Sequence, residues 1–126
     1  MSVVLDASAV LALLYDEPGK EIVLQHALGA RLLSVNLCEV LTRAIDKGGD
    51  PDEVQALIER LQFEIAPFDE DLAIEAAKLR VSTGRIGASL GDRACLAFTA
   101  GSGLPVLTAD QKWAKLDLGI DIRLIR

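Results

Sequence analysis

Five short segments, either apolar runs or alternations of apolar and polar residues, are separated by longer segments of helical character, and this pattern restricts the fold more than any other feature. A run such as Val3-Val4-Leu5 is too short for a helix and is typical of a strand that is buried on both faces. Strands that alternate with helices pair in parallel, because each helix carries the chain back along the sheet. The sequence therefore predicts an α/β protein, a three-layer sandwich in which helices flank a mostly parallel five-stranded sheet.

The positions of these elements follow from the apolar pattern and from the residue types that begin and end helices. Strands are expected near residues 3–5, 32–34, 63–67, 105–108 and 120–124. Helices are expected near residues 7–15, 20–28, 36–47, 51–61, 69–79, 92–100 and 110–113, and residues 84–91 are expected to form a loop. The length fits a single domain over residues 1–126.

Composition limits the ways in which the chain can act. Its net charge is −6 and its pI is about 4.7, which argues against nucleic-acid binding through a broadly basic surface. A nuclease stays open, because bound cations and a local basic rim can offset the acids. No apolar run approaches the roughly 20 residues of a membrane span, and the N-terminal residues do not resemble a signal peptide. We therefore expect a cytoplasmic protein with no membrane partner.

Four acidic residues follow predicted strands or begin predicted helices: Asp6, Glu39, Asp92 and Asp110. Ligands of open parallel sheets bind beyond the carboxyl ends of the strands, where the strand order reverses. Two carboxylates about 4 Å apart would repel each other by about 4 kcal/mol at an effective dielectric constant near 20. A divalent cation relieves such repulsion, and oxygen ligands suit Mg²⁺ or Mn²⁺. The four acids together predict a metal site.

Each acid also has a purely structural explanation. Asp6 fits the N-cap of a helix, and Glu39 fits the third position of a capping box opened by Asn36. Asp92 fits the first turn of a helix, where the helix dipole favours an acid, and Asp110 fits a turn. These explanations are sufficient for any one acid alone. The joint placement of all four favours the metal site for the set.

Neighbouring polar residues suggest supporting roles. Ser8 and Thr108 are placed to hydrogen-bond to the adjacent acids or to bound water, or simply to end a strand or begin a helix. Arg93 and Lys112 are candidates for contacts with phosphate groups. The chain has one histidine, His26, on an ordinary amphipathic helix, so a hydrolytic triad is hard to assemble.

Four stretches in this order resemble the PIN domain family, and within it the VapC-type toxins. They are Val4-Leu-Asp6-Ala-Ser8-Ala, Val35-Asn-Leu-Cys-Glu39-Val-Leu, Ser89-Leu-Gly-Asp92-Arg-Ala-Cys-Leu-Ala and Leu107-Thr-Ala-Asp110-Gln-Lys-Trp113. The resemblance implies that the first and fourth strands are adjacent and that the four acids bind Mg²⁺ or Mn²⁺. It also implies an endoribonuclease that acts on RNA, a VapB-like antitoxin as partner, and a homodimer.

Two other functions compete with this interpretation. One is a metal-dependent phosphatase or phosphoryl-transfer protein with Asp6 as the phospho-acceptor, although Ser8 stands where the common phosphatase pattern has a second acid. The other is a module that binds RNA or an antitoxin without cleaving. Trapping of a phosphorylated acid would favour the first, and RNA binding without metal-dependent products would favour the second.

Overall fold

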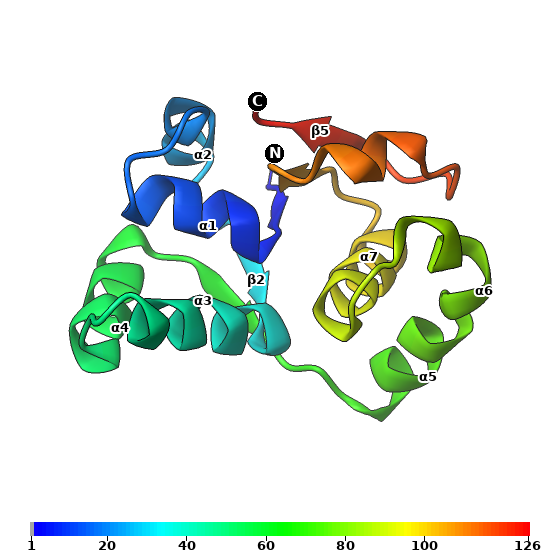
Figure 1. Ribbon diagram of the computed structural model, residues 1–126, viewed down its shortest axis with the longest axis horizontal. Coiled ribbons are helices and arrows are strands. Elements are labelled where there is room, and N and C mark those ends of the chain that lie inside the picture. Colours follow the sequence, from blue (N-terminus) through cyan, green and yellow to red (C-terminus); the bar gives the residue numbers. More distant parts are fainter. Residues whose placement is uncertain (1) are drawn as a thin grey trace.

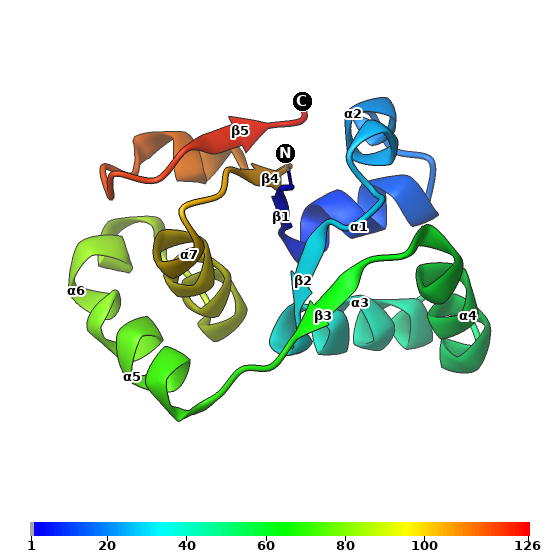
Figure 2. The same cartoon turned by 180° about the vertical axis from the view of Figure 1, so that it is seen from behind.

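The computed structural model describes residues 2–126 and contains one five-stranded parallel sheet (Figure 1, Figure 2). The strands are β1 (Val4–Leu5), β2 (Arg31–Leu33), β3 (Glu64–Ala66), β4 (Val106–Thr108) and β5 (Ile122–Leu124). Their order across the sheet is β3-β2-β1-β4-β5, with every neighbouring pair parallel. The predicted sheet is confirmed, and so is the adjacency of the first and fourth strands.

Helices cover both faces of this sheet. They are α1 (Ala7–Leu14), α2 (Lys20–Gln25), α3 (Ser34–Asp46), α4 (Pro51–Leu61), α5 (Glu70–Lys78), α6 (Arg80–Thr83) and α7 (Leu90–Ser102), with short 3-10 helices η1 (Gly84–Ile86) and η2 (Gln111–Lys115). Figures 1 and 2 show α1 to α4 on one side of the sheet and α5 to α7 on the other. Within residues 2–126 no helix is long and apolar enough to cross a membrane.

The central strand carries the core of both layers, because successive side chains of a strand point to opposite faces. Leu5 belongs to the cluster beneath α1 to α4, whereas Val4 packs with Val106 and Leu96 in the cluster beneath α7. Trp113 of η2 is fully buried in the second cluster, so η2 is anchored to the sheet. The carboxyl ends of β1 and β4 are therefore held between two packed layers.

Several boundaries differ from the sequence prediction. Helix α2 ends at Gln25 rather than near residue 28, α7 begins at Leu90 rather than near residue 92, and α6 is an additional helix. The strand expected near residues 32–34 ends at Leu33, and Ser34 already lies in α3, which begins two residues before the expected start at Asn36. The Ser34 hydroxyl accepts a hydrogen bond from the Phe68 backbone and thereby ties the start of α3 to the chain after β3. The loop expected over residues 84–91 begins as η1, because Gly84 adopts helical dihedral angles.

Candidate active site

The strand order reverses at β1, and this places the ends of β1 and β4 side by side. Leu5 pairs with Leu107, and the Asp6 backbone N–H donates to the Leu107 carbonyl at 3.0 Å. Asp6 follows β1 directly, Thr108 is the last residue of β4, and Asp110 begins η2 two residues later. The topology alone therefore brings Asp6, Thr108 and Asp110 to one edge of the sheet.

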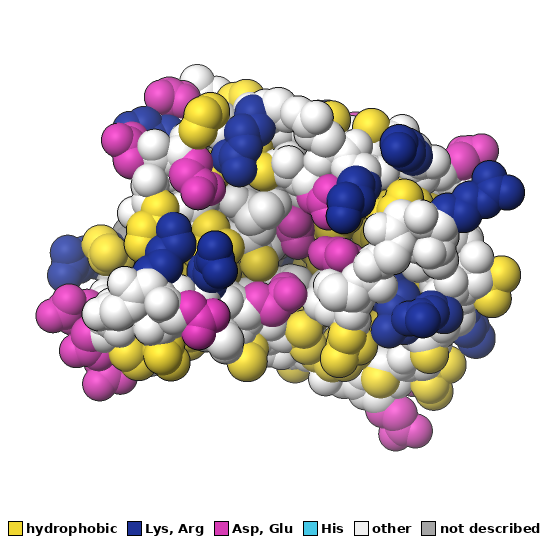
Figure 3. Space-filling model, in the orientation of Figure 1, with side chains coloured by type: hydrophobic (Ala, Val, Ile, Leu, Met, Phe, Trp, Pro, Cys, Tyr) yellow, Lys and Arg dark blue, Asp and Glu magenta, His cyan; other side chains and the backbone are white. Residues whose placement is uncertain are grey.

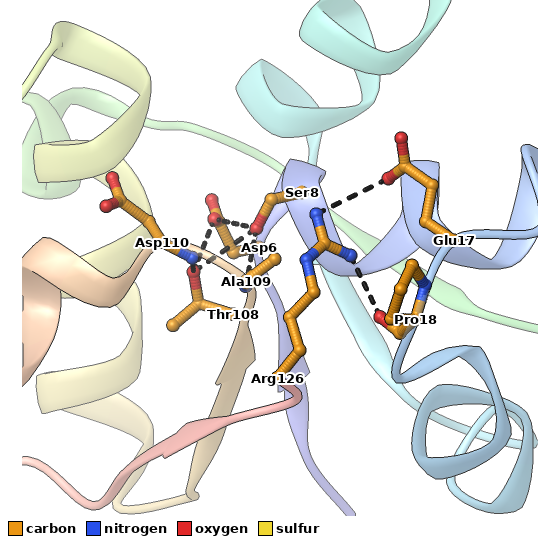
Figure 4. Close-up of polar contacts among 8 residues, drawn as sticks. All are labelled: Asp6, Ser8, Glu17, Pro18, Thr108, Ala109, Asp110 and Arg126. Carbon is orange, nitrogen blue, oxygen red and sulfur yellow. Dashed lines mark hydrogen bonds and ion pairs between the residues drawn. The ribbon is translucent and has the colours of Figure 1, made fainter.

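Asp6 is buried, with 4% of its surface exposed, and two hydroxyls hold one oxygen of its carboxylate (Figure 4). Ser8 Oγ donates to Asp6 Oδ2 at 2.7 Å, and Thr108 Oγ1 donates to the same oxygen at 2.9 Å. Asp6 occupies the N-cap position of α1, but its side chain makes no capping hydrogen bond. The N-cap position of Asp6 is therefore confirmed, but its carboxylate does not cap the helix and is oriented by the two hydroxyls instead.

The direction of these hydrogen bonds is fixed by the surrounding backbone. The Ala109 N–H donates to Ser8 Oγ at 2.9 Å, and the Asp110 N–H donates to Thr108 Oγ1 at 3.0 Å. Each hydroxyl has one proton to donate. Ser8 and Thr108 both donate theirs to Asp6, so neither has a proton left for the 3.2 Å contact between the Ser8 and Thr108 hydroxyl oxygens. The prediction that Ser8 and Thr108 hydrogen-bond to a neighbouring acid is confirmed.

Glu39 is oriented by Asn36, a residue that sequence reasoning treated only as a helix cap. Asn36 is fully buried inside α3, and its Nδ2 donates to Glu39 Oε1 at 2.8 Å and to the Gly91 carbonyl at 3.1 Å. A Cβ at Gly91 would overlap the Glu39 carboxylate, so a side chain at this position would force Glu39 to move. The capping-box explanation of Glu39 is wrong, because α3 begins at Ser34.

Asp92 and Asp110 each serve a local structural purpose as well. Asp92 Oδ2 accepts from the Ser89 N–H at 3.0 Å, and Ser89 Oγ accepts from the Asp92 N–H at 3.2 Å, which completes a capping box at the start of α7. Asp110 Oδ1 accepts from the Lys112 N–H at 3.0 Å and caps η2. The first-turn and turn explanations of these two acids are therefore confirmed.

All four carboxylates nevertheless share one property. Within residues 2–126, each engages a single oxygen in hydrogen bonds to the protein, and none forms an ion pair with Lys, Arg or His. The second oxygen of each is left without a protein donor. A carboxylate held in this way is oriented, yet it keeps one oxygen for a ligand.

Electrostatics identifies which acids act on one another. Burial raises the pKa of Asp6 from 3.8 to about 6, against the two hydroxyl hydrogen bonds, and the charges of Asp92 and Glu39 raise it further. Burial also raises the pKa of Glu39, opposed by the Asn36 hydrogen bond, with a further contribution from the charge of Asp92. We call Asp6, Glu39 and Asp92 the acidic cluster. Asp110 adjoins it through Thr108 but contributes to neither shift.

The donors of the acidic cluster fit a hard divalent cation. All are carboxylate oxygens without a basic partner. Burial is the main cause of the raised pKa of Asp6 and of Glu39, and repulsion from the neighbouring acids adds to it. No group of three or more acidic, His or Cys side chains in residues 2–126 is arranged to enclose one ion. Mg²⁺ commonly uses one or two carboxylates and several waters, so two ligands of the cluster with water suit it.

The two candidate phosphate contacts differ in their surroundings. Arg93 is half-buried, and its Nη1 donates to the Ala76 carbonyl at 3.1 Å, which links α7 to α5. The geometry gives Arg93 no support as a phosphate contact, and that role stays a prediction. Lys112 is exposed at the start of η2, beside Asp110.

The family model described as PIN domain matches residues 3–118. A toxin–antitoxin complex from Klebsiella pneumoniae has 15% sequence identity and a TM-score of 0.77, covering 98% of both chains. VapBC-5 from Mycobacterium tuberculosis has 26% identity and a TM-score of 0.57, covering 99% of this chain and 98% of that one. VapC20 from the same species, a Sarcin-Ricin loop cleaving toxin, has 19% identity and a TM-score of 0.72, covering 94% of this chain and 98% of that one. No curated protein matches.

Proposed function

This chain belongs to the PIN domain family, and we propose that it is a Mg²⁺- or Mn²⁺-dependent endoribonuclease, the toxin of a toxin–antitoxin pair. The observation that carries the proposal is the acidic cluster at the strand-order reversal, where three carboxylates from separate elements interact without a basic partner. Such a cluster is costly to fold unless a cation completes it. Resemblance to VapBC complexes and to a loop-cleaving VapC toxin supports RNA as substrate and a VapB-like antitoxin as partner.

Two of the three carboxylates of Asp6, Glu39 and Asp92 would hold the cation together with waters, with Asp110 beside them for a second ion or a bound water. The chemistry that such an ion supplies is activation of water at neutral pH and stabilisation of the charge that develops on a phosphodiester. This chemistry needs no histidine base. The one histidine of the chain, His26, is the C-cap residue of α2 and is hydrogen-bonded to the Ile22 carbonyl.

The residues around the acids keep them in position for this task. Ser8 and Thr108 donate both of their protons to Asp6 Oδ2, which favours the ionised carboxylate and leaves its other oxygen without a protein donor. Asn36 fixes Glu39 in the same way. Because each support comes from a rigid strand end or helix, the ligand oxygens are placed before the ion or the RNA arrives.

The expected partners follow from the same charge pattern. An acidic cluster without basic residues of its own suits a basic side chain of an antitoxin, which would replace the cation and block cleavage. A homodimer, which the family resemblance implies, is part of the proposal and is tested by the molecular mass in solution.

The test is cleavage of RNA with Mg²⁺, with Mn²⁺ and with chelator, by the wild type and by Asp6→Asn. The exposed Asp117→Asn is the matched control, because it removes the same charge from a site outside the acidic cluster. We expect metal-dependent cleavage by the wild type and the control, and none by Asp6→Asn. Undiminished cleavage by Asp6→Asn, or hydrolysis of small phosphate esters without RNA cleavage, would reject the proposal, and so would RNA binding without products.

A further inference from the structure

Two basic hollows lie on opposite sides of the acidic cluster. We infer that they bind the phosphates of one RNA strand on the 5′ side and on the 3′ side of the bond that is cut. This inference rests on the proposed function. The α3 hollow is lined by Ser8, Leu11, Glu17, Arg43, Lys47 and Arg126, and has a volume of about 200 Å³. The η hollow is lined by Ser82, Arg85, Ile86, Lys112, Lys115 and Leu116, and has a volume of about 640 Å³.

The α3 hollow touches the acidic cluster through Ser8, which lines it and also donates to Asp6. Arg43 and Lys47 lie four residues apart, so they project from the same face at the end of α3. Lys47 Nζ is 4.1 Å from the centroid of the Tyr15 ring, and this cation–π contact fixes the ammonium without neutralising it.

Arg126 closes the α3 hollow but is partly neutralised. Its guanidinium donates to the Pro18 carbonyl at 2.9 Å and approaches Glu17 at 3.6 Å (Figure 4). Neither Arg43 nor Lys47 forms an ion pair in the described part of the chain. These two side chains are therefore the phosphate-binding groups of this hollow, and Arg126 shapes its wall.

The η hollow has three cations and no acid in its lining. Arg85, Lys112 and Lys115 are all exposed, and none of them forms an ion pair within residues 2–126. The hollow is joined to the acidic cluster by hydrogen bonds, from Lys112 N–H to Asp110 and from Asp110 N–H to the Thr108 hydroxyl. Thr108 in turn donates to Asp6, so the segment that follows β4 connects the hollow to the acidic cluster.

The surface shows the resulting charge pattern. In Figure 3, acidic side chains gather in the middle of one face, and Lys and Arg side chains lie on either side of them. The protein as a whole has a net charge of −6, but charges farther than about 8 Å are largely screened at physiological ionic strength. Local cations therefore govern the approach of a phosphate, and a strand that crosses the cluster meets cations at both flanks.

An RNA strand fits this pattern better than an acidic peptide does. A polynucleotide carries one phosphate per nucleotide, so a strand whose middle lies over the cluster necessarily offers phosphates to both hollows. The hollows bind and position the RNA strand, whereas the acidic cluster promotes cleavage of the phosphodiester bond. Loss of either hollow should therefore weaken RNA binding and leave the cleavage of a very short substrate unchanged.

The test uses two double variants, Arg43→Gln/Lys47→Gln and Arg85→Gln/Lys115→Gln. The control Arg60→Gln/Lys78→Gln removes two exposed cations outside both hollows. Binding of a labelled single-stranded RNA is measured by fluorescence anisotropy with Ca²⁺ in place of Mg²⁺, at several salt concentrations. RNAs shortened from the 5′ end or the 3′ end are compared with the full strand.

Affinity for RNA falls as salt rises, and in each hollow variant the slope of log affinity against log salt should be shallower by about 1.4. This is about 0.7 for each of the two phosphates that the variant no longer neutralises. The affinity deficit of each variant should shrink about sevenfold between about 50 and 200 mM salt. In each variant, shortening the RNA at one end should no longer weaken binding, whereas shortening it at the other end should still do so. The end that no longer matters should be the 5′ end for one variant and the 3′ end for the other.

Three results would overturn the inference. Hollow variants that cleave and bind RNA like the control would remove the hollows while leaving the proposed nuclease intact. Variants that lose affinity for the antitoxin but not for RNA would make the hollows a protein interface. A wild type that neither binds nor cleaves RNA would remove the proposed function, and this inference with it.

Discussion

Replacing Asp6 by asparagine should stabilise the metal-free protein while it abolishes metal-dependent cleavage. Asp6 is almost completely buried, and its carboxylate accepts hydrogen bonds from Ser8 and Thr108 through one oxygen. An asparagine can accept the same two hydrogen bonds through its Oδ1. It brings no negative charge next to Glu39 and Asp92, and so resembles the protonated form of Asp6.

The magnitude follows from the pKa of Asp6, which is raised from 3.8 to about 6 in the folded protein. A shift of about two pKa units corresponds to about 3 kcal/mol. The Asp6 carboxyl binds its proton more tightly in the folded protein than in the unfolded chain, and this difference stabilises the fold while Asp6 is protonated. The contribution of about 3 kcal/mol is therefore fully present below about pH 4 and is lost as the pH rises through about 6. At pH 7.5 the metal-free wild type therefore carries the full cost, and Asp6→Asn avoids it.

The measurement is denaturant unfolding with chelator at pH 7.5 and at pH 4, for the wild type, Asp6→Asn and the control Asp117→Asn. We expect Asp6→Asn to gain about 3 kcal/mol at pH 7.5 and almost nothing at pH 4, whereas the control stays close to the wild type at both. Added Mg²⁺ should stabilise the wild type and not Asp6→Asn. Equal or lower stability of Asp6→Asn at pH 7.5, or a gain of the same size at pH 4, would refute the reasoning.

The supports of the acids give three further predictions. Gly91→Ala should displace Glu39 and lower cleavage about 10- to 100-fold, with unfolding measured in parallel, because its Cβ overlaps that carboxylate. Asn36→Leu should lower cleavage by a similar factor and lower stability in denaturant titration by about 1 to 3 kcal/mol, because the Gly91 carbonyl and the Glu39 carboxylate both lose a donor. Ser8→Ala removes a donor to Asp6 and should raise the Asp6 pKa above about 6, which NMR titration of the metal-free protein measures. Unchanged cleavage by Gly91→Ala and Asn36→Leu, or an unchanged titration of Asp6, would contradict these roles.

The sequence was sufficient for the sheet because its central strands are short apolar runs and its edge strands β3 and β5 alternate apolar with polar residues. Val4 and Leu5 are completely buried on opposite faces of the same strand. A short apolar run is typical of such a strand, which is covered on both faces. Helix ends were less predictable. Ser34 enters α3 directly from β2 without a side-chain cap, and Gly84 adopts helical angles although glycine usually interrupts a helix.

The site was predictable where it depends on topology and not where it depends on packing. Asp6 and Asp110 follow parallel strands that end at one edge of the sheet, so the topology alone predicts that they approach each other. The contact of Asn36 with Gly91 joins residues that are 55 positions apart, and it depends on how closely α3 and α7 pack. No local sequence pattern indicates such a contact, so the sequence predicts only a helix cap for Asn36 and only a loop position for Gly91.

The structural and the functional explanations of the acids are not alternatives, because a carboxylate has two oxygens. Asp92 caps α7 with one oxygen, and Asp110 caps η2 with one oxygen, just as Asp6 and Glu39 each use one for a neighbouring side chain. A cap that engages one oxygen also fixes the direction of the other, which is what a ligand of a metal ion requires. Helix starts and strand ends that would be ordinary in any α/β protein thus become, at the strand-order reversal, a set of oriented oxygens. The same local chemistry that makes each acid unremarkable alone is what prepares the four to act together.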